Sequence, residues 1–272
     1  MSKTITDRKR PIYVGFASQK GGVGKSTLAE LFSAILYYER GIDLLVVDCD
    51  GRQESFLKLR ERDRDTIEEY PEIAQGMQLH FKKFGKPSYP ISAVPVEEAL
   101  KEVSRLIGTE KVLTPELVIF DFPGHASTLE LLNLSIEMDY IISPIEPDVQ
   151  SLASSLAYAK TIEDIGVSTD NARIKELFLF WNKVDRRAKN SVIEEYTRYI
   201  KEHGLSLLDA KVYSSVKFSR ELALGGVKGV FRCSYLPPAP ALRIGTGIDE
   251  WVTELLNRIQ LTTIRDEQDG NH

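Results

Sequence analysis

Residues 19–27 read Gln-Lys-Gly-Gly-Val-Gly-Lys-Ser-Thr, a glycine-rich run that contains two lysines. An apolar run, residues 12–17, precedes it, and a helical pattern, residues 26–38, follows it. Glycines let the backbone curl so that several N–H groups point at one anion, and the positive end of the helix dipole lies at the same place. The stretch therefore predicts a phosphate-binding loop, in which Lys25 reaches the β- and γ-phosphates and the Ser26 hydroxyl ligates Mg²⁺.

Apolar runs alternate with helical patterns along the whole chain. The runs are nearly continuous, as is typical of strands that are buried on both faces. We therefore expect an α/β fold with a single doubly wound, mostly parallel sheet flanked by helices on both faces. The expected strands are residues 12–17, 44–48, 117–121, 140–145, 177–181 and 210–213. The expected helices are residues 26–38, 96–107, 127–138, 149–165, 191–203 and 248–259.

Length and composition favour a cytoplasmic globular protein. The chain has 272 residues, of which 42% are apolar, and no run approaches the roughly 20 uninterrupted apolar residues of a membrane span. Its two cysteines lie far apart without metal-type spacing, and its N-terminus lacks a secretion signal. We expect one domain over residues 1–262, with a polar arm at 1–10 and a polar tail at 263–272. Residues 63–95 fit no clear pattern and suggest a variable excursion.

The charge is unevenly distributed. The net charge of −5 argues against a uniformly basic nucleic-acid binder. Residues 171–235 nevertheless hold 13 Lys/Arg and 7 Asp/Glu, a balance of +6, whereas the remaining 22 Lys/Arg and 33 Asp/Glu give −11. This segment indicates either a patch that faces DNA or an ordinary solvated surface. The candidate contacts to a phosphate backbone are Lys217, Arg220, Lys228 and Arg232.

Acidic residues end two of the expected strands. Asp48 and Asp50 close the strand at 44–48, and Asp121 closes the strand at 117–121. Ligands of parallel sheets bind beyond the carboxyl ends of the strands, and residues two apart in an extended chain share one side. These carboxylates are therefore placed to hold Mg²⁺ and to orient the water that attacks a phosphate. The alternative is that they are ordinary turn aspartates after a strand.

The loop Lys-Gly-Gly-Val-Gly-Lys-Ser-Thr at residues 20–27 resembles the deviant Walker A box of the ParA/MinD family of ATPases, and the chain looks most like the ParA-type partition proteins. The resemblance implies an ATPase domain that uses ATP and Mg²⁺. It also implies an ATP-dependent sandwich dimer, in which Lys20 reaches the phosphates held by the second subunit. Gly51 and Arg52 replace the family's Pro-Gln after Asp50.

The resemblance assigns roles to individual residues. The catalytic residues would be Lys20, Lys25 and Asp50. The nucleotide-binding residues would be Gly21, Gly22, Val23, Gly24, Lys25, Ser26, Thr27 and Asn182, with Asn182 at the adenine. The metal-ligating residues would be Ser26, Asp48 and Asp121. Residues 213–221 resemble the family's late loop near the base, with Ser214 in place of a proline.

Two segments also match GTPases. Residues 121–124 fit Asp-x-x-Gly, and residues 182–185 fit the guanine-reading motif Asn-Lys-x-Asp. Three features favour ATP over GTP. They are Gln19, which stands where the common phosphate loop has glycine, the additional Lys20, and the paired aspartates.

The resemblance implies a molecular switch. The ATP-bound homodimer would bind a surface, and hydrolysis of ATP would release the protein from it. For a ParA-type protein, the partners would be non-specific DNA and a centromere-binding or cargo adaptor protein. The cargo would be a plasmid, a chromosome or a mobile element. A MinD-like membrane switch is an alternative, but the helix at 248–259 is mainly acidic, so we expect it to dock on its own domain without stable membrane insertion. A P-loop kinase or ligase of small molecules is the other alternative.

Overall fold

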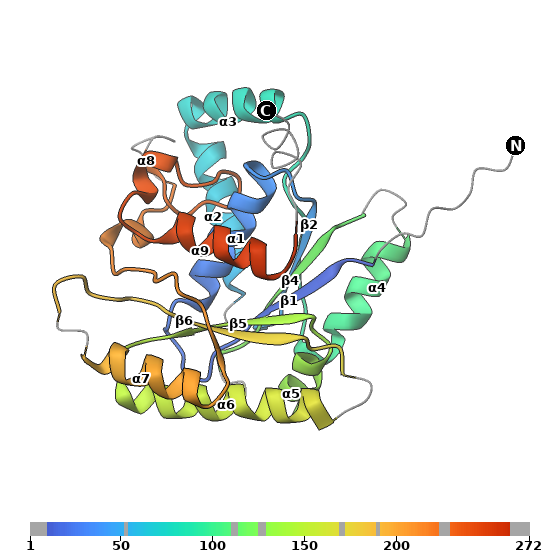
Figure 1. The fold of residues 1–272 in the computed structure, drawn as a ribbon. Coiled ribbons are helices and arrows are strands. Elements are labelled where there is room, and N and C mark those ends of the chain that lie inside the picture. The colour runs from blue at the N-terminus through green and yellow to red at the C-terminus, as the bar shows by residue number, and fades with distance from the viewer. Residues whose placement is uncertain are drawn as a thin grey trace, which may run out of the picture.

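One parallel sheet organises the molecule. The structure is a computed structural model that describes residues 10–51, 54–109, 114–124, 129–168, 172–188, 191–222 and 229–261. The sheet has seven strands in the order β3-β2-β4-β1-β5-β6-β7 (Figure 1). The strands are β1 (Ile12–Phe16), β2 (Leu44–Asp48), β3 (Ile91–Ala93), β4 (Leu117–Asp121), β5 (Tyr140–Ile145), β6 (Glu176–Trp181) and β7 (Ser206–Leu207). The expected tail and all but Arg10 of the expected arm lie outside the described residues.

Helices cover both faces of the sheet, as the sequence predicts (Figure 1). The helices are α1 (Lys25–Tyr38), α2 (Ser55–Glu69), α3 (Pro71–Phe84), α4 (Ala99–Thr109), α5 (Leu129–Ile136), α6 (Val149–Ser168), α7 (Ser191–Glu202), α8 (Pro240–Arg243) and α9 (Ile248–Arg258). Helices α1 and α9 pack in one apolar cluster, whereas α4, α5, α6 and α7 pack in the other.

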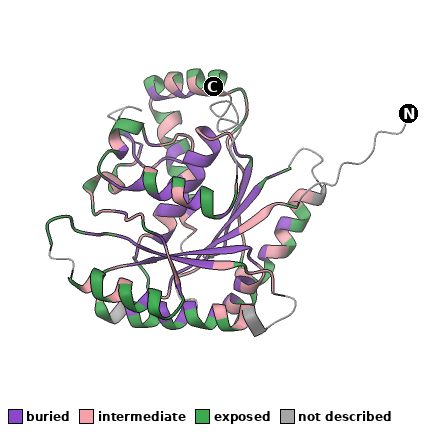
Figure 2. Ribbon diagram, viewed as in Figure 1, coloured by how far each residue is buried: buried purple, intermediate pink, exposed green. Residues whose placement is uncertain are grey.

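Successive side chains of a central strand contribute alternately to these two apolar clusters. In β4, Leu117 and Ile119 belong to the cluster of α1, whereas Val118 and Phe120 belong to the cluster of α4. Successive side chains of a strand point to opposite faces, so a strand covered on both sides must be apolar throughout. Figure 2 shows the central strands buried and the outer surfaces of the helices exposed.

The sequence correctly predicts most elements and is wrong at residues 210–213. Five expected strands match β1, β2, β4, β5 and β6 within one residue at either end, and all six expected helices are present. Residues 210–213 form no regular strand, because they run beyond the end of β6. The Val212 N–H donates to the carbonyl of Trp181 at 2.9 Å, and its carbonyl accepts the N–H of Val184 at 3.0 Å. Tyr213 makes an isolated bridge with Val184. The strand beside β6 is instead β7, and residues 63–95 contain the last seven residues of α2, all of α3 and β3.

Helix α9 docks on its own domain, as its acidic amphipathic pattern predicts. Trp251 is fully buried, and the centre of its ring lies 5.1 Å from that of Phe180, 5.6 Å from Phe32 and 6.3 Å from Phe16. The apolar side of α9 is therefore used within the fold. In the described ranges, no helix combines the length and apolarity that crossing a membrane requires.

Replacing Trp251 by alanine tests this docking. We expect Trp251→Ala to lower the free energy of unfolding by about 3–5 kcal/mol, because it leaves a large cavity between α9, α1 and the sheet. Urea denaturation followed by circular dichroism measures this change. Leu79→Ala is the control, because Leu79 is 64% exposed on α3, and its effect should stay within about 0.5 kcal/mol. Equal losses in the two variants would contradict the account of α9.

Candidate functional site

The loop between β1 and α1 has a backbone that requires glycine. Gly22 and Gly24 have φ angles of +80° and +84°, a left-handed conformation that residues with a Cβ rarely adopt. A Cβ on Gly24 would also lie 3.0 Å from the side-chain nitrogen of Asn182. Gly24 is the N-cap of α1, so the loop delivers the positive end of that helix to the carboxyl end of the sheet.

Lys25 and Asp121 form a buried ion pair at the base of this loop. The Lys25 side chain is 7% exposed, and its ammonium contacts one carboxylate oxygen of Asp121 and, at 3.1 Å, the hydroxyl of Ser26. The second carboxylate oxygen of Asp121 is buried and has no hydrogen-bond partner among the described residues. The pair thus retains one acceptor atom without a partner beside the loop.

Asp48 lies beside Asp121, because the two residues are register partners in β2 and β4. Its carboxylate accepts the backbone N–H groups of Asp50, at 3.1 Å, and Phe56, at 2.9 Å. Burial, together with the negative charge of Asp121, raises the pKa of Asp48 to about 6. Two buried carboxylates side by side favour a cation between them.

The residues at this edge fit a Mg²⁺ ion that is shared with phosphate. Carboxylate, hydroxyl and phosphate oxygens are the ligands that Mg²⁺ prefers, and the unpartnered oxygen of Asp121 supplies one of them. Across the described ranges, no group of three or more His, Cys, Asp or Glu side chains could hold a metal alone. A metal here would therefore depend on Ser26, on Asp48 and Asp121, and on oxygens of the nucleotide.

The two lysines of the loop have different environments. Lys20 lies at the surface, with 45% of its side chain exposed, and its ammonium contacts the Asp148 carboxylate at 3.0 Å. This hydrogen bond to Asp148 raises the pKa of Lys20, so the side chain stays cationic. Lys25 is buried in the site and Lys20 is exposed at its rim, although only four residues separate them.

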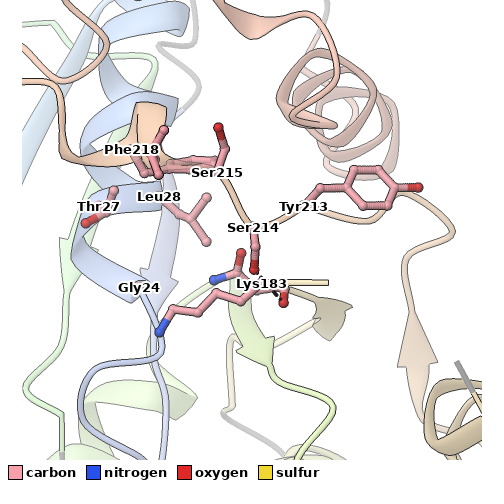
Figure 3. Close-up of a pocket in the computed structure, with 10 residues that line it drawn as sticks. Gly24, Thr27, Leu28, Lys183, Tyr213, Ser214, Ser215 and Phe218 are labelled. Atoms are coloured by element: carbon pink, nitrogen blue, oxygen red, sulfur yellow. Dashed lines mark hydrogen bonds between the residues drawn. The ribbon is translucent and has the colours of Figure 1, made fainter. Parts of the chain in front are cut away.

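Two adjoining cavities extend from the loop. The first, here called the loop cavity, has a volume of about 250 Å³. It is lined by Ser18, Lys20, Gly21, Gly22, Gly24, Lys25, Ser26, Thr27, Glu30, Asp50, Ser55, Gly124 and Arg232. The second, the Asn182 cavity, has a volume of about 470 Å³ (Figure 3). It is lined by Gly24, Thr27, Leu28, Asn182, Lys183, Tyr213, Ser214, Ser215, Val216 and Phe218.

The two cavities together have the chemistry of a nucleotide site. They share Gly24 and Thr27, so they adjoin at the start of α1. The loop cavity is lined by cations and by the glycine-rich backbone, which suit a phosphate chain, whereas the Asn182 cavity is mostly apolar, which suits the plane of a base. Tyr213, Ser214, Ser215, Val216 and Phe218, from the segment that the sequence associates with the base, line the Asn182 cavity. Figure 3 shows four of these side chains, those of Tyr213, Ser214, Ser215 and Phe218.

The end of β6 holds the phosphate loop directly. Asn182 is buried, and its side-chain nitrogen donates to the carbonyl of Val23 at 2.7 Å. The Lys183 ammonium donates to the carbonyl of Gly22 at 2.6 Å. The amide of Asn182 therefore lies where loop and cavity meet.

The position of Asp185 argues against recognition of a guanine base by residues 182–185. Asp185 is exposed and accepts the backbone N–H of Arg187 at 2.8 Å, and it is not among the residues that line the Asn182 cavity. In the Asn-Lys-x-Asp motif, the aspartate must face the base. The resemblance of residues 182–185 to a GTPase motif is thus one of sequence rather than of position.

Sequence reasoning missed two charged residues of the loop cavity, Glu30 and Arg232, as well as Ser18 and Ser55. Glu30 is buried in α1 and pairs with Arg232, which lies 202 residues further along the chain. The available signal was that Glu30 is the single charged residue in the mainly apolar run at residues 28–36. The sequence offers Arg232 as a candidate contact to a phosphate backbone, whereas in the structure its side chain is 17% exposed and is held by Glu30 and Glu221.

The other three candidate contacts to a phosphate backbone offer fewer exposed cations than the sequence suggests. The Lys217 ammonium donates to the carbonyls of Leu242, at 2.8 Å, and Ile244, at 3.0 Å. Arg220 is exposed, whereas Lys228 and Arg52 lie outside the described residues. Of the four candidates, Arg220 is therefore the one described as an exposed cation.

The fold and the site define a class of protein. A parallel sheet with a glycine-rich loop between its central strand and the following helix, and with acids ending two neighbouring strands, is a P-loop nucleotide-binding fold. The model of the family described as "CobQ/CobB/MinD/ParA nucleotide binding domain" matches residues 14–226. The chain belongs to this family, which confirms the resemblance to ParA and MinD proteins.

Individual relatives are distant. A protein of Methanocaldococcus jannaschii described as uncharacterized is 28% identical over 201 residues, which are 65% of this chain and 75% of that protein. Among solved structures, a protein of Borrelia burgdorferi B31 described as a plasmid partition protein, with AMPPNP bound, has a TM-score of 0.57. It is 15% identical and covers 92% of this chain and 100% of its own.

Two further structures share the fold. The MinD cell division protein of Aquifex aeolicus has a TM-score of 0.52 at 13% identity, covering 93% of this chain and 98% of its own. A ParA family ATPase of Chlorobium tepidum TLS has a TM-score of 0.51 at 17% identity, covering 90% and 99% respectively. At these identities the likeness is one of fold.

Proposed function

We propose that this chain is a ParA-type ATPase, which dimerises when it binds ATP, binds DNA non-specifically and partitions or positions a plasmid, chromosome or mobile-element cargo. The observation that carries the proposal is the separation of the two loop lysines. Lys25 is buried against Asp121, where it can act on the nucleotide of its own chain. Lys20 is exposed at the rim, where a second subunit could receive it.

The roles within one chain follow from the two cavities. Lys25 and the loop N–H groups would bind the phosphates, and Asn182 with residues 213–218 would bind adenine. Asp50 lines the loop cavity and would orient the attacking water. Phosphoryl transfer depends mainly on positioning and on charge stabilisation, so a site that only the dimer completes acts as a switch.

Mg²⁺ fits the same site. Ser26, Asp48 and Asp121 would hold it, and the ion would supply positive charge against the phosphate oxygens. The unpartnered oxygen of Asp121 and the raised pKa of Asp48 both support a cation at this place.

The family and the fold support our proposals for the ligand, the domain bounds, the cellular location and the surface that is bound. The bound AMPPNP of the Borrelia protein and the name of the Chlorobium ATPase support ATP as the ligand. We infer a single ATPase domain over residues 1–262, because one sheet and its two helical layers account for the described chain. We also infer a cytoplasmic protein with an adaptor that recognises the cargo. The docked α9 favours DNA over a membrane as the bound surface.

Binding and hydrolysis assays test the proposal together. We expect fluorescence anisotropy to show binding of a labelled duplex of arbitrary sequence with ATP and Mg²⁺ but not with ADP. This binding should weaken steeply as salt is raised, because contacts to phosphates release counterions. ATP should be hydrolysed in preference to GTP. Preference for GTP, binding of anionic lipid vesicles in place of DNA, or transfer of phosphate to a metabolite would each overturn it.

A further inference from the structure

Arg232 brings a third cation to the loop cavity, besides Lys20 and Lys25. It comes from the segment that follows residue 229, far in sequence from the phosphate loop. Its guanidinium makes two contacts with one carboxylate oxygen of Glu30, at 2.9 Å from Nε and 2.7 Å from one terminal nitrogen. The other terminal nitrogen lies 2.9 Å from the carboxylate of Glu221.

These contacts fix the guanidinium and still leave it able to bind a ligand. A guanidinium has five N–H donors in a rigid fork. The hydrogen bond from Nε to Glu30 uses one of them, and the terminal nitrogens lie within ion-pair distance of Glu30 and Glu221. Among the described residues, no other side chain pairs with these nitrogens. Arg232 therefore combines a fixed orientation with spare donors in a cavity that has the chemistry of a phosphate site.

Glu30 is suited to hold Arg232 and to little else. Its side chain is 2% exposed in an otherwise apolar stretch of α1, where an acid without a partner would be costly. Burial raises the pKa of Glu30 to about 8, and the charge of Arg232 opposes that rise. Its second carboxylate oxygen is buried without a partner among the described residues.

The position of Arg232 indicates which phosphate it can reach. Arg232, Asp50 and Gly124 line the loop cavity but not the Asn182 cavity, which suits the base. The end of the nucleotide furthest from its base would therefore be the end near Arg232. A planar fork suits the oxygens of a terminal phosphate, because it can donate two parallel hydrogen bonds.

We propose that Arg232 binds the terminal phosphate of the nucleotide held by its own chain, and that Glu30 is the positioning residue that presents it. This assignment rests on the proposed nucleotide site. It makes Arg232 a selector of nucleoside triphosphate over diphosphate, acting within one subunit, whereas Lys20 would act between subunits.

Isothermal titration calorimetry with Mg²⁺ and either AMPPNP or ADP tests this role. We expect Arg232→Gln to weaken AMPPNP binding by roughly 10- to 100-fold, the loss expected for hydrogen bonds to a charged group. Binding of ADP should change by less than about threefold, because ADP lacks the group that Arg232 contacts. Arg232→Lys should restore part of the preference, since it keeps the charge and loses the fork.

The controls separate binding from folding. Arg62→Gln removes another partner of Glu221, at 3.1 Å, from a residue that does not line the loop cavity, and it should leave both affinities unchanged. If Arg232→Gln fails to fold, Glu30→Gln combined with Arg232→Gln replaces the buried pair by neutral amides and should lose the same preference. Circular dichroism reports the fold of each variant.

The outcomes distinguish the two proposals. A wild-type chain that binds neither nucleotide contradicts the proposed function itself. A wild-type chain that binds both, together with an Arg232→Gln variant that keeps the wild-type ratio of AMPPNP to ADP affinity, overturns the role of Arg232 alone. An equal loss for the two nucleotides also overturns it, because that pattern is what a purely structural ion pair predicts.

Discussion

Lys25→Ala is expected to lose nucleotide binding. Its ammonium is the buried cation of the loop, and removing it deletes charge-assisted hydrogen bonds to the phosphates. We expect the affinity for ATP to fall by about a hundredfold or more, and hydrolysis to fall to background. Titration calorimetry and a phosphate-release assay measure these two effects.

The same substitution also affects the fold, because it leaves Asp121 buried without its cation. Breaking a buried pair by removing one partner costs about 3–5 kcal/mol, so urea denaturation must accompany the binding assay. Lys25→Gln is a second variant that keeps a hydrogen-bond donor beside Asp121. Lys160→Ala is the surface control, because Lys160 pairs with Asp164 on the exposed side of α6. A folded Lys25→Gln protein with wild-type affinity would contradict the site.

Lys20→Ala is expected to separate binding from hydrolysis. Lys20 is exposed and contacts Asp148 rather than Asp121, so its loss should leave the affinity of one chain for ATP nearly unchanged. The hydrolysis rate should fall by about a thousandfold, the order of effect of a cation that a partner supplies to the transition state. The rate at saturating ATP, set beside the affinity from calorimetry, measures this separation.

Asp148→Asn is the matched control for Lys20. It removes the carboxylate that holds the lysine at the rim but keeps the lysine itself. Hydrolysis by Asp148→Asn should therefore equal or exceed that of the wild type. Wild-type hydrolysis in Lys20→Ala, or an equal loss in both variants, would contradict a role for Lys20 in a second subunit.

The sequence predicts the parts of the fold whose burial pattern is simple. The strands β2, β4 and β5 are apolar on both faces, and their bounds agree with the expected ones. Helix α2 was missed because its buried face is not purely apolar. Asp63 is buried there, and it accepts the backbone N–H and the hydroxyl of Ser234, at 2.6 and 2.8 Å. Such a position cannot be recognised before its distant partner is known.

The same distinction holds for the site. The loop, Asp48 and Asp121 were predicted because they form local patterns at strand ends, and the parallel sheet brings them together. Asn182 follows β6 and was predicted on the same basis. Glu30 and Arg232 could not be predicted, because their pairing depends on tertiary structure across 202 residues. The sequence therefore offers Arg232 only as a candidate cation for a surface patch.

Mixing two inactive variants tests the central claim, a site that two subunits complete. Lys20→Ala keeps Asp50 and the nucleotide cavities, whereas Asp50→Ala keeps Lys20. In a mixed dimer, the site on the Lys20→Ala chain receives Lys20 from the other chain. We expect the mixture to hydrolyse ATP at a rate well above the sum of the rates of the separate variants. Hydrolysis by the mixture that equals that sum, in chains that each bind ATP and each form the dimer, would contradict it.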